Sequence, residues 1–352
     1  MRIWSRAGRL PVVAMLAAAA LTGAARAEVP RVAADILPVH GLVARVMQGL
    51  GEPDLVVPPG ASPHGYAMRP SEARALSQAD VVFWLGEPLT PWLTDALSEL
   101  ASDAAQVELI SAPGTRVMEV RSGALFAADS DHDASDGHDA HADPEVQNDQ
   151  ERHAHEAGHE EDGGQVSEEA KVSLEDGLAH AHTGADPHAW LLPENALVWL
   201  DVVAAELAAA DPANAEAYAA NAAAGKAEIA AAAEEVSAAL APVRERAVIV
   251  FHDAYQYFEA GFGLRTAGAI AMSDAASPSP SRIAELRDAA GELGVACVFS
   301  EPQFNPGLVA AVAEGSGAGT AVLDPMGSHL EPGAQFYPAL LRDLGQAVAA
   351  CN

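Results

Sequence analysis

Between residues 31 and 111, short apolar runs alternate with stretches in which apolar residues recur every three or four positions. The apolar runs predict four strands, at residues 31–34, 54–57, 81–84 and 107–110. The stretches between them predict three helices, at residues 42–50, 71–76 and 91–100. This alternation indicates a parallel sheet with helices on both faces, and such sheets bind ligands beyond the carboxyl ends of their strands.

The same alternation returns in the last third of the chain. It predicts four further strands, at residues 247–251, 266–271, 296–300 and 320–323. It also predicts three helices, at residues 281–292, 306–314 and 334–349. The chain is therefore expected to contain a second parallel sheet with its own helices.

A long alanine-rich stretch separates the two regions. Residues 194–210 predict one helix, and Asp211 followed by Pro212 predicts the start of another that runs to about Leu240, just before Pro242. The second helix carries a single apolar stripe, made of Tyr218, Ala222, Gly225, Ile229, Val236 and Leu240. Nearly thirty helical residues form a rod of roughly 40 Å, long enough to brace two lobes.

These patterns predict an α/β protein with two lobes, each with a mainly parallel sheet flanked by helices, joined by one long rigid helix. The expected N-terminal lobe covers residues 28–210, the linking helix residues 211–242 and the C-terminal lobe residues 243–352. Residues 1–27 have a basic start, an apolar run and an Ala-Arg-Ala end, which predicts a cleaved signal peptide and an exported protein.

The apolar pattern disappears in the expected N-terminal lobe between residues 126 and 184. This segment is rich in Asp and Glu and contains eight histidines, namely His132, His138, His141, His153, His155, His159, His180 and His182. Such a composition cannot bury enough apolar surface to form a core, so we expect a disordered loop. It is either a solubilising tract or a low-affinity collector of divalent cations.

The composition narrows the classes of partner. The chain has 352 residues, half of them apolar, and a formal net charge of −31. Such a charge disfavours nucleic acid as a partner and favours cations. The two cysteines, Cys297 and Cys351, are expected to form a disulfide in an oxidising compartment.

Four side chains are candidates for a metal site between the lobes. His64 follows the second predicted strand, His188 lies at the junction before the helical stretch, and His252 and Asp324 directly follow strands of the second sheet. Three neutral imidazoles suit tetrahedral Zn²⁺, with water or Asp324 in the fourth position. The alternative is that each histidine satisfies a loop carbonyl and that Asp324, before Pro325, is a turn residue.

Five segments occur in the order of a known family. They are PGASPH at residues 59–64, DPHAW at 186–190, FHDAYQYF at 251–258, SEPQF at 300–304 and LDP at 323–325. Together they resemble the motifs of the zinc-binding solute-binding proteins of bacterial ABC importers, the ZnuA type. The resemblance covers nearly the whole chain after the signal peptide.

The resemblance implies that His64, His188 and His252 ligate zinc and that Asp324 lies close to the metal or completes its shell. Manganese-binding relatives carry glutamate at the position of His252, so the histidine favours zinc. Some zinc-binding members have a carboxylate just before the first histidine, whereas this chain has Pro63, which leaves the fourth ligand open between Asp324 and water. The histidine-rich loop and a bridge like Cys297–Cys351 also occur in zinc-binding members.

The expected function is that of a monomeric periplasmic receptor that hands Zn²⁺, its transported ligand, to the permease of an ABC transporter. An enzyme is not expected. One alternative is a zinc hydrolase, but the His-Glu-x-x-His sequence at residues 155–159 lies in the expected disordered loop and not on a predicted helix, and the sequence contains no nucleophile elbow. Another is a zinc buffer in which the histidine-rich loop is the functional part.

Other residues near these motifs have simpler interpretations. Glu301 either orients an imidazole through its second nitrogen or caps a turn. Trp190 and Tyr257 are expected in the core, and His40 and His329 in structural or exposed positions.

Overall fold

The computed structural model describes residues 29–126, 184–272 and 277–351. The predicted signal peptide lies outside these residues, as does the histidine-rich segment from 127 to 183. The first sheet is fully parallel with strand order β2-β1-β3-β4. Its strands are β1 (Val32–Ala34), β2 (Asp54–Leu55), β3 (Val81–Trp84) and β4 (Ala105–Glu108).

Helices cover both faces of this sheet, as predicted. On one face, Val81 and Phe83 of β3 pack with α1 (Leu37–Val46) and α5 (Pro193–Ala210). On the other face, Val82 and Trp84 pack against α2 (Pro70–Ser77) and α3 (Pro91–Leu100). All four residues of β3 are buried, which explains why that strand is a continuous apolar run in the sequence.

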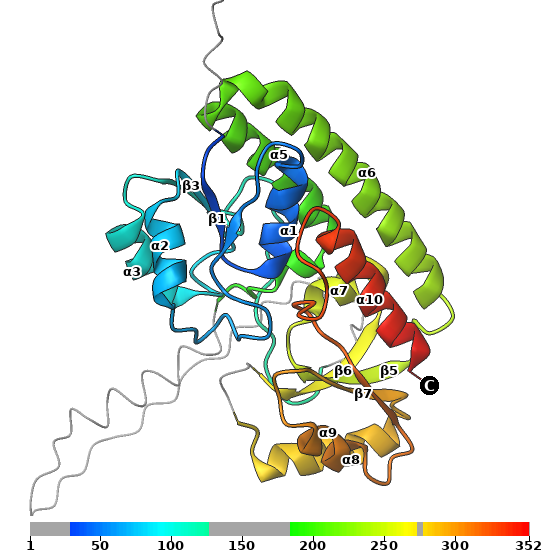
Figure 1. The fold of residues 1–352 in the computed structure, drawn as a ribbon. Helices are drawn as coiled ribbons and strands as arrows, with labels where there is room; N and C mark the ends of the chain where they lie inside the picture. Colours follow the sequence, from blue (N-terminus) through cyan, green and yellow to red (C-terminus); the bar gives the residue numbers. More distant parts are fainter. Residues whose placement is uncertain (1–28, 127–183, 273–276, 352) are drawn as a thin grey trace, which may run out of the picture.

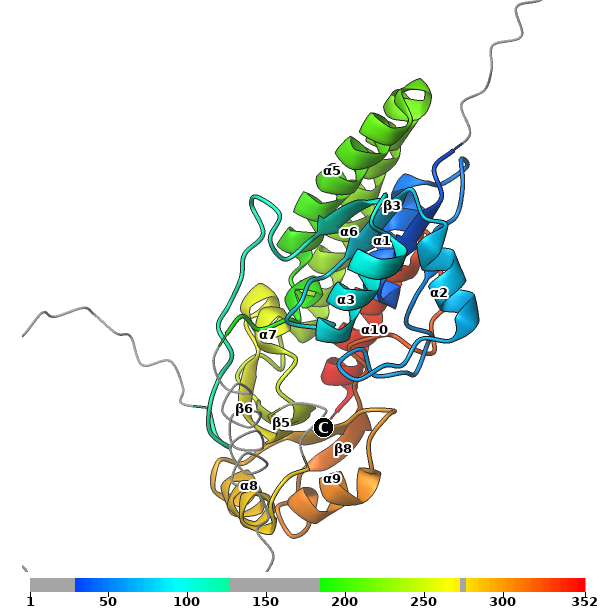
Figure 2. The ribbon, with the colours of Figure 1, turned by 90° about the vertical axis from the view of Figure 1, so that its left-hand side faces the viewer.

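The second sheet is also fully parallel, with strand order β6-β5-β7-β8. Helices α8 (Pro280–Glu292) and α9 (Pro306–Ala313) cover its outer face, and α7 (Gln256–Phe262) and α10 (Phe336–Ala350) lie on the side that faces the first lobe (Figures 1 and 2). Its strands are β5 (Ala247–His252), β6 (Arg265–Ala271), β7 (Cys297–Ser300) and β8 (Gly319–Val322).

The long predicted helix is present as α6 (Ala215–Leu240), preceded by one 3-10 turn, Pro212–Asn214. Its 26 residues span about 39 Å and run past α1 and α10 toward the second sheet in Figure 1. The predicted apolar stripe is its buried face. That face packs on α5, α1 and α10, so the rod is held along its length.

The buried core passes between the lobes without a break. Helix α10, in the predicted C-terminal lobe, packs on α1 of the predicted N-terminal lobe as well as on α6. One core cluster therefore contains residues of both sheets and of all the helices between them. The limits at residues 210 and 242 remain predictions.

A second connection between the lobes was not predicted. After β4 the chain reaches the second sheet, where Leu125 pairs antiparallel with Gly268 on the edge strand β6. The backbone N–H of Phe126 donates to Ala267 at 2.9 Å, and that of Ala269 donates to Ala124 at 3.2 Å. We call residues 118–126 the crossing segment.

An arginine anchors the crossing segment. The Arg121 guanidinium forms ion pairs with Asp253 and with Glu259, the latter at 2.8 Å, and lies 3.8 Å from the ring centre of Phe126. Burial disfavours the charge, but the hydrogen bonds and charges of the two carboxylates outweigh it and raise the pKa of Arg121. The guanidinium thus stays charged and ties the segment to α7 and to the end of β5.

Some element limits differ from the prediction. Helix α1 begins at Leu37, five residues before the predicted start, because all ten of its residues are buried and no polar face marks its period. Helix α7 was missed because it is short and carries three buried aromatic residues. Strand β4 begins two residues earlier than expected.

Two further features concern the whole chain. Cys297 and Cys351 form a disulfide that joins β7 to the residue after α10, as predicted. Within the parts of the chain that the structure describes, no helix has the length and apolar character needed to cross a membrane.

Candidate metal centre

Two of the predicted histidines are in contact, with their ring planes inclined at 65°. His252 is the last residue of β5, and His188 precedes a single 3-10 turn, Ala189–Leu191. Their Nε2 atoms are 3.3 Å apart. Both residues are buried, with exposed fractions of 6% for His188 and 3% for His252. Residues 64 positions apart in the sequence thus converge on one point.

A buried carboxylate contacts the other nitrogen of each ring. Asp186 Oδ1 lies 2.8 Å from His188 Nδ1, and Glu301 Oε1 lies 2.7 Å from His252 Nδ1. Asp186 and Glu301 are each only 2% exposed. Of the two roles considered for Glu301, the structure therefore shows the contact with an imidazole.

His64 approaches from the first lobe. Its loop is held by the Trp92 indole, which donates a 2.7 Å hydrogen bond to the carbonyl of Pro63. The ring centres of His64 and His188 are 5.7 Å apart. All three imidazoles line a cavity of about 10 Å³, a volume that suits one water molecule or one small ion.

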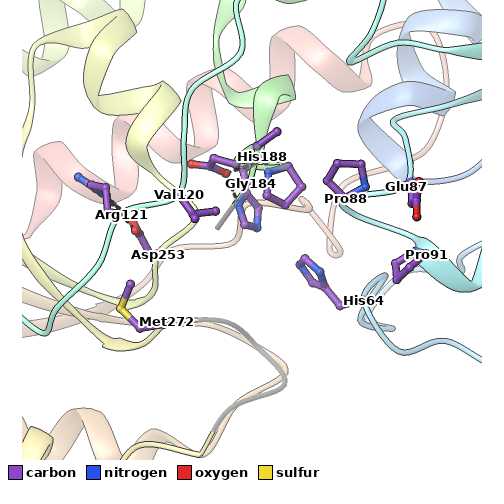
Figure 3. A pocket seen from close by; sticks show the side chains of 13 residues that line it. His64, Glu87, Pro88, Pro91, Val120, Arg121, Gly184, His188, Asp253 and Met272 are labelled. Carbon is purple, nitrogen blue, oxygen red and sulfur yellow. Dashed lines mark hydrogen bonds and ion pairs between the residues drawn. The ribbon is translucent and has the colours of Figure 1, made fainter. Parts of the chain in front are cut away.

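A larger cavity of about 570 Å³ lies beside this small one and is shown in Figure 3. His64 lies on the side of Glu87 and Pro91 from the first lobe, and Arg121 and Asp253 lie opposite. His188 stands between the two sides and lines both cavities. The imidazoles are therefore reached through a cleft between the lobes.

Asp324 faces its own loop. Its Oδ1 accepts the backbone N–H of Met326 at 3.0 Å, and its Oδ2 accepts the N–H and the hydroxyl of Ser328 at 2.7 and 2.6 Å. The residue is 3% exposed. Asp324 was expected to be either a metal ligand or a turn residue. The structure shows the turn contacts, in which both carboxylate oxygens accept hydrogen bonds.

Buried aromatic residues position the Asp324 loop against the histidines. The Trp190 indole donates to the carbonyl of Pro325 at 2.9 Å, and the Tyr255 hydroxyl donates to that of Leu323 at 3.0 Å. Burial, followed by the negative charges of Glu301 and Asp324, raises the pKa of Tyr255. Tyr255 therefore remains a hydrogen-bond donor at physiological pH.

Within residues 29–126, 184–272 and 277–351, no group of three or more His, Cys, Asp or Glu side chains is close enough to enclose a metal ion. The histidine pair is in contact, whereas His64 stands on the other side of the cleft. A three-histidine site at this place needs a small inward movement of the His64 loop or of a lobe.

The remaining histidines and aromatic residues agree with their simpler interpretations. His40 is buried in α1, where its Nε2 lies 3.0 Å from the carbonyl of Pro53, and burial lowers its pKa. His329 is exposed and pairs with Asp343 at 3.2 Å. Trp190 and Tyr257 are in the core.

Sequence reasoning missed three polar side chains around the pair. Asp186 belongs to the DPHAW segment, but its role was not inferred. Gln256 donates to Asp186 Oδ2 at 3.0 Å, and Gln303 donates to Glu301 Oε2 at 3.0 Å. The two-residue spacing of Asp186 from His188 was the available signal, whereas the glutamine contacts depend on tertiary packing.

Two parallel-sheet lobes braced by a long helix, with a cleft that ends at histidines, define a solute-binding protein of a transport system. The family model described as "Zinc-uptake complex component A periplasmic" matches residues 32–351, so the chain belongs to the ZnuA family. The members of this family are transport binding proteins and not enzymes. The expectation of no enzyme is confirmed, and the hydrolase alternative is wrong.

Named relatives agree with this assignment. The high-affinity zinc uptake system protein ZnuA of Paracoccus denitrificans is 41% identical over 347 residues, which cover 98% of each chain. That of Brucella abortus is 39% identical over 320 residues, 91% of each chain. A crystal structure of a ZnuA deletion mutant with zinc bound has the same fold, with a TM-score of 0.63, 23% identity and coverage of 92% of this chain and 98% of that one.

Proposed function

We propose that this protein is a periplasmic zinc receptor that binds Zn²⁺ in the cleft between its lobes and delivers it to the permease of an ABC importer. His64, His188 and His252 are the proposed ligands. Zinc is the transported ligand and not a resident cofactor. A monomer suffices for this role, because the three histidines and both lobes belong to one chain.

One distance carries the proposal. Two imidazole nitrogens that bind the same tetrahedral Zn²⁺ at 2.0–2.1 Å are separated by about 3.3–3.4 Å. The Nε2 atoms of His188 and His252 are 3.3 Å apart. The pair therefore has the spacing of two zinc ligands, and the small cavity beside it is also lined by His64.

The fourth position is proposed for water. Asp324 remains the alternative, but both of its carboxylate oxygens accept hydrogen bonds from Met326 and Ser328 in its own loop. Asp324→Ala is expected to retain zinc binding more fully than His188→Ala. An equal loss of zinc affinity in the two variants would indicate that Asp324, and not water, is the fourth zinc ligand.

The test is calorimetric titration of metal-stripped protein with Zn²⁺ and with Mn²⁺. We expect one tight zinc event and weak manganese binding, because imidazole suits zinc and a carboxylate-rich site suits manganese. His188→Ala and His252→Ala should lose more affinity than the 10- to 100-fold typical of residues behind the ligands. Full zinc affinity in both variants would sink the proposal.

His40→Ala is the matched control. His40 is also a buried histidine, but it contacts Pro53 and none of the proposed ligands. The variant is expected to lower the stability of the fold and to leave zinc affinity unchanged. A loss of zinc binding in this variant would mean that destabilisation alone explains the other losses.

The histidine-rich segment is proposed as an auxiliary collector of zinc. Deleting residues 128–183 keeps Gly184, whose carbonyl accepts the N–H of Val120 at 3.1 Å beside the large cavity. We expect the deletion to remove weak zinc events and to keep the tight one. Loss of the tight event would favour a buffer in which the segment is the functional part.

A further inference from the structure

The two carboxylates that touch the histidine pair are held in similar surroundings. Asp186 Oδ1 also accepts the backbone N–H of His188 at 2.9 Å, while its Oδ2 accepts from the Gln256 amide. Glu301 Oε1 contacts His252 Nδ1, while its Oε2 accepts from the Gln303 amide. In both cases one oxygen faces an imidazole and a glutamine holds the other.

This arrangement decides which ring nitrogens carry protons. An ionised carboxylate only accepts hydrogen bonds, so an imidazole nitrogen 2.7–2.8 Å from one must carry the hydrogen. A neutral imidazole protonated on Nδ1 has a lone pair on Nε2. The Nε2 atoms of His188 and His252 are therefore both acceptors.

Two acceptors that face each other do not satisfy one another. At 3.3 Å, in a buried place, the two lone pairs repel each other. Between two neutral rings, a hydrogen shared by the Nε2 atoms would turn one unprotonated Nδ1 toward a carboxylate. The pair is thus arranged for a cation between its Nε2 atoms.

We propose that Asp186 and Glu301 are positioning residues that keep the Nδ1–H form of His188 and His252, so that half of the zinc site exists before the metal arrives. This rests on the proposed function, because it takes the two histidines as ligands. His64 joins last, from the opposite side of the cleft. Gln256 and Gln303 prevent the carboxylates from turning away.

Neighbouring rings restrict the imidazoles further. The His188 ring lies 5.3 Å from that of Trp190, and the His252 ring lies 5.7 Å from that of Phe304, in an edge-on arrangement. Phe304 itself stacks on Phe251 at 4.2 Å. Packing and hydrogen bonding therefore select the same ring orientation without metal.

The first test needs no variant. Long-range ¹⁵N–¹H correlation spectra of the metal-free protein, with histidines assigned by His188→Ala and His252→Ala, report which ring nitrogen carries the hydrogen. We expect Nδ1–H for both residues. Nε2–H at either residue in the wild-type protein would overturn the inference.

Glu301→Gln and Asp186→Asn provide the second test. In Glu301→Gln, the neutral amide can present either its oxygen or its NH2 group to His252, so it no longer requires a hydrogen on Nδ1. We expect His252 to shift toward the Nε2–H form and zinc affinity, measured by competition with a chromophoric chelator, to fall 10- to 100-fold. Asp186→Asn should do the same to His188, because its amide can likewise present NH2 to the ring.

Glu259→Gln is the control, because Glu259 is a carboxylate of the same lobe that pairs with Arg121 and contacts neither imidazole. It should leave the ring spectra and the zinc affinity unchanged. Unchanged spectra and affinity in Glu301→Gln and Asp186→Asn would refute the positioning role, while loss of binding in His188→Ala and His252→Ala would leave the proposed function standing. Retained affinity in those two histidine variants would instead refute the function itself.

Discussion

At the scale of single residues, Asp35 shows how backbone N–H groups bind a buried carboxyl group at the end of a strand. It directly follows β1 and is fully buried. Its two oxygens accept the backbone N–H groups of Ile36 at 2.8 Å and of Leu85, after β3, at 2.7 Å. Burial outweighs these hydrogen bonds and raises the pKa of Asp35 to about 7.

This pKa gives the stability of the fold a pH dependence. Because the folded state holds the Asp35 proton more tightly than the unfolded chain, the contribution of this group is full below pH 3.8 and is lost as pH rises through about 7. The loss amounts to at most about 1.4 kcal/mol per pH unit.

Asp35→Asn tests this dependence. The amide has one acceptor oxygen for two buried N–H groups, so we expect the variant to be about 1–3 kcal/mol less stable at pH 5. At pH 8 the difference should shrink, because the wild-type protein then carries the buried charge. Urea unfolding of metal-free protein at both pH values measures this, and an equal difference at pH 5 and pH 8 would contradict the raised pKa.

At the scale of elements, the close contact of α10 with α6 depends on a glycine. A Cβ atom at Gly345 would lie 2.8 Å from Cγ1 and 3.0 Å from Cγ2 of Val236. Valine is branched at Cβ and cannot turn aside easily. The absence of a side chain at Gly345 thus lets the last helix lie directly on the brace between the lobes.

Gly345→Ala is therefore expected to lower the free energy of unfolding by about 1–2 kcal/mol, since overpacking outweighs the gain in helix propensity. Gly291→Ala in α8 is the matched control, because a Cβ there meets nothing within 4 Å. That change should raise stability by up to about 1 kcal/mol. Denaturant unfolding measures whether the unfolding free energy falls in Gly345→Ala and rises in Gly291→Ala. A rise in both variants would disprove the close packing at Gly345.

At the scale of the whole molecule, a continuous core joins the lobes. Among the described residues, helix α6 and the segment at residues 118–126, anchored by Arg121, also connect them. Two connections and the packing of α10 on α1 oppose a wide hinge movement. A small adjustment at the His64 loop fits this construction better than a large rotation of the lobes.

The disulfide also stabilises the whole molecule, because it restricts the conformations of the unfolded chain. It links residues 54 positions apart, and the loss of that loop closure is expected to cost about 4 kcal/mol. Replacing both Cys297 and Cys351 by Ala should lower the unfolding free energy by this amount and leave zinc affinity unchanged. Cys297 begins β7, whereas His252 is the last residue of β5, at the opposite edge of the sheet. A large loss of affinity would contradict this separation.

The two sheets, the long helix and the place of His252 at the end of β5 could be predicted from the sequence. Apolar periodicity reflects local burial, and each parallel strand carries its following residue to the same sheet edge. Where burial is complete, as in α1, the pattern loses its period, so the start of that helix was misplaced.

The sequence by itself determined both sheets, the long helix and which residues follow the strands, because these features depend on interactions among neighbours in the chain, whereas α7 was missed. Only the tertiary structure decided that Glu301 contacts His252, that Asp324 turns into its own loop and that the segment after β4 crosses to β6. These contacts depend on how the lobes pack around the shared helices. The direction of a side chain at a sheet edge is set by partners far away in the sequence.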